Sequence, residues 1–169
     1  AAALREQNYL ALCICWGGVG MVLAMGKILG GNAPFGVALT AVMPFPLVLP
    51  SAIGGILGYL VGGGMQVSFP LVGAILITAL VRWTLGTRWD KHPVWLGPIL
   101  AGGTVFLTGV FPLLYRSPLI YDVVMWATQV VMGAASASFL ERAVRVVRGR
   151  KAPADRLDST ALCVMGALL

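Results

Sequence analysis

The sequence predicts an all-α fold, a polytopic bundle of transmembrane helices. Three observations lead to this prediction: residues 28–81 contain no charged side chain, hydrophobic residues make up 59% of the chain, and charged residues make up only 11%. Soluble domains carry roughly 25% charged residues, because their surface must be wetted by water. A long stretch without charges therefore lies in lipid or among other apolar helices.

Seven apolar segments are expected, because a helix that spans a bilayer needs roughly 20 mostly apolar residues. Charged residues or groups of glycine and proline separate these segments. The predicted segments are residues 8–29, 34–49, 50–63, 69–81, 94–114, 118–140 and 160–169. The last segment is cut off at Leu169, so we expect the chain to be a fragment of a longer protein.

The second and third segments are shorter than a usual span and are interrupted by Pro44, Pro46 and Pro50. Two interpretations remain open: two thin, kinked spans, or one re-entrant hairpin. In both interpretations the chain returns to the side of the membrane that it left.

The basic residues predict an orientation with the N-terminus in the cytoplasm of a bacterial cell. All but two of the 12 lysines and arginines then lie inside, in the N-terminal tail, in the loop after Arg82 and in a basic loop at residues 141–159. Lys27 and Arg116 lie outside. Membrane proteins concentrate basic residues on the cytoplasmic side, and a single span over residues 34–63 would place the loop after Arg82 on the wrong side.

Small residues at a spacing of four predict close helix packing. Gly54, Gly58 and Gly62 share one helix face, and Gly133 and Ala137 share another. Small side chains at this spacing allow two helix backbones to approach closely. The face is typical of a dimer interface or of packing within one chain, and we expect the second.

Polar residues inside the membrane are candidates for function. Asp122, Gln129 and Ser136 are spaced by seven, so they share a face of the sixth segment, with Asp122 at its outer end. Gln129 is the amide that lies deepest in the apolar region, and we expect it to form an interhelical hydrogen bond rather than to line a route for a solute or proton.

Three arginines follow the sixth segment on adjacent helical turns: Arg142, Arg145 and Arg148. Such a cluster near a cytoplasmic leaflet is attracted to anionic lipid by about 1 kcal/mol per basic residue. The alternative, which we expect, is a plain determinant of topology. His92, the single histidine, is expected in a solvated loop.

The sequence offers no catalytic, cofactor or metal site. Six acidic residues are scattered over the chain, and the three cysteines lie inside apolar segments without a second cysteine or histidine pair. The net charge of +6 comes from basic residues at the ends of apolar segments, which predicts contact with the lipid bilayer and not with nucleic acid.

Five stretches, taken in order, resemble the membrane region of the stage II sporulation protein E family. They are residues 33–38 (APFGVA), 49–60 (LPSAIGGILGYL), 79–83 (ALVRW), 98–103 (PILAGG) and 133–142 (GAASASFLER). Together they extend the resemblance over almost the whole chain.

The resemblance implies a larger bundle of spans, followed by a linker and a cytoplasmic PP2C-type serine phosphatase domain that uses Mn or Mg. That enzyme activates the forespore sigma factor by removing phosphate from an anti-anti-sigma factor. The family also associates with the cell-division protein FtsZ at the asymmetric septum. This chain would then supply the membrane anchor and help the protein to self-associate. The alternative is a small-solute transporter or a substrate-binding membrane subunit, which also carries glycine-rich broken helices.

Overall fold

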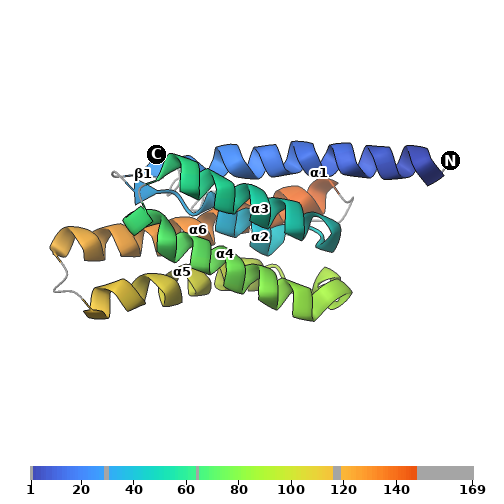
Figure 1. Cartoon of the computed structure of the whole chain (residues 1–169). Coiled ribbons are helices and arrows are strands. Elements are labelled where there is room, and N and C mark those ends of the chain that lie inside the picture. The colour runs from blue at the N-terminus through green and yellow to red at the C-terminus, as the bar shows by residue number, and fades with distance from the viewer. Residues whose placement is uncertain (1, 29–30, 64, 116–118, 148–169) are drawn as a thin grey trace.

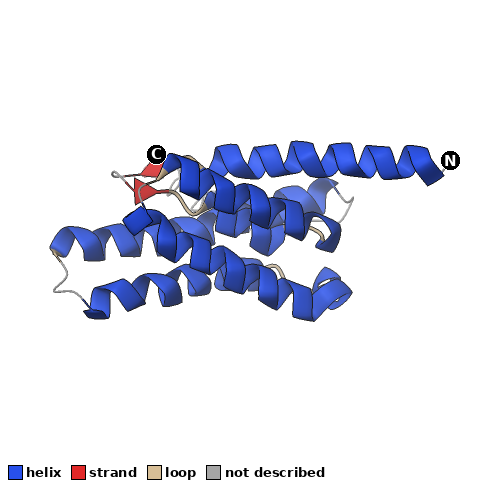
Figure 2. Ribbon diagram, in the orientation of Figure 1, coloured by secondary structure: helices blue, strands red, loops and turns tan. Residues whose placement is uncertain are grey.

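The computed structural model describes residues 2–28, 31–63, 65–115 and 119–147 (Figure 1). Helices make up nearly all of this part of the chain, and a two-stranded antiparallel hairpin lies at one end of it (Figure 2). The elements are α1 (Ala2–Ala24), β1 (Lys27–Ile28), β2 (Gly31–Asn32), α2 (Phe35–Val42), α3 (Phe45–Gly62), α4 (Met65–Leu85), the 3₁₀-helix η1 (Gly86–Lys91), α5 (Leu96–Tyr115) and α6 (Ile120–Val147).

The predicted all-α bundle is confirmed. Four helices in the described part of the chain are long and apolar enough to cross a membrane: Phe45–Gly62, Phe69–Trp89, Leu96–Tyr115 and Ile120–Arg145. A shorter apolar helix covers Cys13–Ala24. The expected seventh segment, residues 160–169, lies outside the described residues.

Helix α3 begins earlier than the sequence predicts. We expected a boundary at Pro50, but α3 starts at Phe45 and contains Pro50 in its interior. Pro46 lies in the first turn, where a backbone N–H has no partner within the helix anyway. Proline inside a membrane helix is tolerated because neighbouring groups satisfy the freed backbone atoms.

Helix α2 is short and lies in the centre of the bundle. It has 8 residues, or about 12 Å, and Gly36–Val42 are all buried. Gly36 lies against Gly55, midway along α3, whereas the carbonyl of Ala41 lies against Arg82 near the end of α4. Helix α2 therefore runs through only one half of the bundle. Residues 31–34, which precede it, lie beside α6 in the other half.

Helices α3 to α6 alternate in direction, and α1 runs parallel to α3, so the bundle has two distinct ends (Figure 1). We call one the basic end; it carries η1, the start of α5 and the end of α6. The other is the hairpin end, with β1 and β2. The core between them consists mostly of small and branched apolar side chains grouped around α2, including Val37, Ala38 and Leu39, with Ile75 and Ala101 from neighbouring helices.

Candidate functional site: a buried polar cluster at the basic end

Charged side chains are buried where the basic end joins the bundle. Arg82 has no exposed surface, Glu141 is 2% exposed and Arg142 is 8% exposed. A charge removed from water is costly unless it is paired or hydrogen-bonded. Ionisable residues inside membrane helices are also candidates for function. This cluster is therefore the candidate site of the described chain.

Arg82 binds the C-terminal end of α2. Its Nη1 donates a 2.6 Å hydrogen bond to the carbonyl oxygen of Ala41, one of the last carbonyls of that helix. The guanidinium also lies 4.6 Å from the centre of the Trp89 ring, as in a cation–π contact. A cation at this position satisfies an orphan carbonyl and complements the negative end of the helix dipole.

The 3₁₀-helix η1 brings Trp89 and His92 together. Side chains three residues apart are eclipsed in a 3₁₀-helix, and these two rings stack with centres 4.2 Å apart. His92 Nδ1 also contacts the carbonyl oxygen of Trp89. Gly86, at the junction with α4, has φ +51°, a backbone conformation that favours glycine.

Glu141 joins the end of α6 to η1. Its Oε1 lies 2.9 Å from Arg145 Nε and 2.9 Å from His92 Nε2. The contact with Arg145 is a hydrogen bond, whereas the His92 N–H is not aligned for one, so that contact is an ion pair when the ring is protonated. Arg145 Nη2 also donates a 2.8 Å hydrogen bond to the His92 carbonyl oxygen.

The cluster holds helices together and has no nucleophile activated by a base. Glu141 Oε2 is buried without a hydrogen-bond partner in the described chain and faces Gly97, where a Cβ would lie 3.4 Å away. Among the described residues, no group of three or more His, Cys, Asp or Glu is placed to hold a metal ion. The contacts that the cluster does form hold α2, η1 and α6 together electrostatically.

This arrangement differs from what the sequence predicts for His92 and the arginines. The His92 side chain is only 9% exposed, not solvated. Arg142 is buried, and Arg145 is engaged by Glu141, so these two do not form a face toward lipid. Arg148 lies outside the described residues. The physical reason is that α6 continues beyond the apolar segment and packs its charged turn against η1.

One contact of this cluster has a local signal in the sequence. Glu141 and Arg145 are four residues apart on a helix, the spacing of a favourable pair. The partnership with His92 joins segments far apart in the chain, and no local pattern indicates it.

The predicted glycine face lies against α1 of the same chain. A Cβ at Gly54 would overlap the carbonyl oxygen of Gly17, and one at Gly58 would overlap that of Met21. A Cβ at Gly62 would lie 3.1 Å from the Cα of Met25. The two backbones therefore approach along three successive turns.

The small residues of α6 also face the interior. A Cβ at Gly133 would lie 3.4 Å from Pro34, and Ala137 is fully buried. One turn earlier, Gln129 Nε2 donates a 2.9 Å hydrogen bond to the carbonyl oxygen of Asn32. Ser136 instead bonds the carbonyl of Met132 in its own helix.

Tyr59 forms a second polar site, which no pattern in the sequence predicts. Its hydroxyl accepts a 3.1 Å hydrogen bond from the amide of Gly36 and donates a 3.0 Å one to the carbonyl of Ala33. It therefore caps the N-terminal end of α2 from within α3. A tyrosine in a glycine-rich apolar helix is the only local sign of this role.

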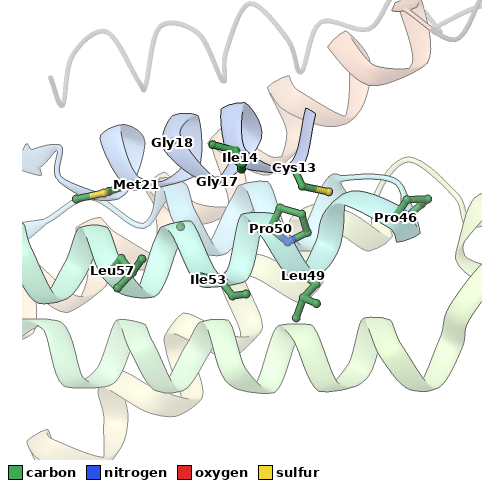
Figure 3. Close-up of a pocket in the computed structure, with 11 residues that line it drawn as sticks. Cys13, Ile14, Gly17, Gly18, Met21, Pro46, Leu49, Pro50, Ile53 and Leu57 are labelled. Carbon is green, nitrogen blue, oxygen red and sulfur yellow. The ribbon is translucent and has the colours of Figure 1, made fainter. Parts of the chain in front are cut away.

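An apolar groove of about 460 Å³ lies between α1 and α3 (Figure 3). Its floor includes Gly17, Gly54 and Pro50, and its rim carries the exposed side chains of Ile14 and Leu49. The lining residues that the structure describes carry no charge, and they include the free thiol of Cys13.

Comparisons of the chain with protein-family models, with curated proteins and with solved structures find no match. The resemblance to stage II sporulation protein E therefore rests on the sequence stretches quoted above.

Proposed function

We propose that this chain is the multi-pass membrane region of a longer protein, inserted with its basic end and its N-terminus in the cytoplasm. One observation carries the proposal: Glu141 joins the end of α6 to the η1 turn, so the segments from which the two basic loops begin lie at one end of the bundle. The positive-inside rule then gives both loops the same orientation. Between the two ends, large apolar side chains such as Leu80 and Leu107 are exposed, as lipid contact requires.

We further propose that the region anchors a sporulation-specific PP2C-type serine phosphatase and helps it to self-associate. The support is the resemblance of five stretches in the right order along the chain. The phosphatase domain, its Mn or Mg ions, and its contacts with FtsZ and the anti-anti-sigma factor would all lie in other parts of the protein. The membrane region would place that domain at the polar septum.

The test uses the complete gene product in a sporulating cell. A fluorescent fusion is expected to be enriched at the polar septum, and the purified full-length protein should release phosphate from a phosphorylated anti-anti-sigma factor in the presence of Mn. A uniform membrane distribution together with the lack of an encoded phosphatase domain would overturn the sporulation part and leave the membrane region standing.

A small-solute transporter is the second candidate, favoured by the course of α2. Helix α2 starts inside the bundle beside buried polar groups, as the broken helices of transporters do. However, Tyr59, Asn32 and Gln129 use polar atoms there to hold α2 and the segment before it. Solute uptake by the purified chain in reconstituted vesicles would favour the transporter over the anchor.

A further inference from the structure

We propose that the outer face of η1 binds the headgroups of anionic lipids. We define the outer face as Arg88 and Lys91, with Trp83 and Trp95 on the two flanking segments. The inference rests on the proposed membrane insertion with the basic end at the cytoplasmic surface, and it is independent of the phosphatase part of that proposal.

The 3₁₀ geometry of η1 separates its side chains into stripes. Residues three apart are eclipsed, so Trp89 and His92 share one stripe and Arg88 and Lys91 share another. The first stripe points into the bundle: Trp89 is 4% exposed and stacks on His92. The second stripe is exposed. Contacts on the inner side therefore hold the turn so that two cations project from it together.

Arg88 and Lys91 form no hydrogen bond or ion pair with any described residue. Among the cations of the basic end whose side chains the structure describes, Arg82 bonds the Ala41 carbonyl, Arg145 bonds Glu141, and Arg142 is buried. Arg88 and Lys91 are the exposed cations of this described set, so they are open to an external anion. Two cations on adjacent turns suit a phosphate group, which offers several acceptor oxygens.

The flanking tryptophans indicate that this anion belongs to a lipid. Trp83 is 62% exposed and Trp95 is 61% exposed. Exposed indole rings prefer the depth of the headgroups, where one side is apolar and the other is wet. This places Arg88 and Lys91 near the lipid phosphates, and their long apolar stems let the charged ends reach them.

The proposed surface replaces the one that the sequence predicts on α6. Attraction to anionic lipid was one of two interpretations of Arg142 and Arg145, but Arg142 is buried and Arg145 pairs with Glu141. Anionic lipids of the cytoplasmic leaflet attract basic residues near the membrane surface. At the described basic end, the residues that they would attract are Arg88 and Lys91 of η1.

The test measures lipid retention by the purified chain in uncharged detergent. Native mass spectrometry would count bound phosphatidylglycerol and phosphatidylcholine with identical acyl chains. We expect a preference for phosphatidylglycerol that falls about fivefold for each charge removed, and about 25-fold in the double variant Arg88→Gln/Lys91→Gln. Lys27→Gln, at the exposed hairpin end, is the matched control and should keep the preference.

Two further arms make the outcome decisive. Arg88→Lys/Lys91→Arg preserves the charges and should retain the preference, even if the Gln variant is less stable in detergent. Inorganic phosphate at millimolar concentration should not displace the lipid, because it lacks the apolar part that the tryptophans contact. Equal retention of the two lipids by the native chain, or an equal loss in Lys27→Gln, would overturn the lipid surface alone. Retention of neither lipid would count against membrane insertion itself.

Discussion

At the scale of single residues, glycine decides how close α1 and α3 can approach. Gly58 lies against the backbone of Met21, where even a methyl group would overlap a carbonyl oxygen. Gly103, on α5, has no heavy atom within 4 Å of the position that a Cβ would take. The two residues are both in helix interiors, so they form a matched pair for testing close packing.

Gly58→Ala is expected to destabilise the bundle by about 1–3 kcal/mol, because the added methyl must push two backbones apart. Gly103→Ala should be neutral or gain up to about 1 kcal/mol, since alanine favours the helix and meets no neighbour. Thermal unfolding of the two variants in detergent measures the difference. The same shift in both variants would contradict a contact specific to Gly58.

At the scale of elements, α2 depends on its neighbours for stability. A helix of 8 residues is marginal by itself, because the cost of starting it is spread over few hydrogen bonds. The structure holds both of its ends: Tyr59 bonds the amide of Gly36, and Arg82 bonds the carbonyl of Ala41. The central helix is thus fixed by two polar side chains from α3 and α4.

Tyr59→Phe tests the first of these contacts. The change removes only the hydroxyl and leaves the Gly36 amide and the Ala33 carbonyl without this partner, at a cost of about 1–3 kcal/mol for each group left unsatisfied. Tyr115→Phe is the control, because Tyr115 is 81% exposed. Hydrogen exchange of the α2 amides should accelerate in the Tyr59 variant and stay unchanged in the control.

The junction of α6 with η1 gives a prediction about charge. Glu141→Gln removes the carboxylate between Arg145 and His92, and we expect a loss of about 1.5–3 kcal/mol, the range for a hydrogen bond to a charged group. In a double-mutant cycle, adding His92→Gln should cost much less in the Glu141→Gln background than alone. Full additivity of the two changes would show that the two side chains do not interact.

At the scale of the whole molecule, the two ends of the bundle should face opposite sides of the membrane. In a variant without cysteines, Thr87→Cys in η1 should react with an impermeant maleimide only after the cells are permeabilised. Leu119→Cys, exposed before α6 at the opposite end, should react in intact cells. Reaction of Thr87→Cys from outside would reverse the proposed orientation.

The fold class follows from composition and from the spacing of charges. Residues 28–81 have no charged side chain, and in lipid a helix satisfies its backbone hydrogen bonds within its own segment. The sequence alone predicts the packing face of Gly54, Gly58 and Gly62, because helical periodicity puts residues four apart on one face. It also predicts that Gln129 lies deep within its apolar segment. The predicted segment bounds are less accurate: residues 94–114 match α5 within two residues at each end, whereas α6 ends seven residues after the predicted residue 140.

The tertiary structure alone decided which polar residues meet. Nothing near Tyr59 in the sequence indicates Gly36, and nothing near His92 indicates Glu141, because these partners come from helices that pack only in the folded bundle. Neighbouring helices also determine where α3 begins and how long α2 is. They satisfy backbone groups around Pro50 in α3, which starts at Phe45, and at the two ends of α2. Local periodicity specifies the apolar face of a helix, whereas a buried charge or hydroxyl is placed by whichever distant group can satisfy it.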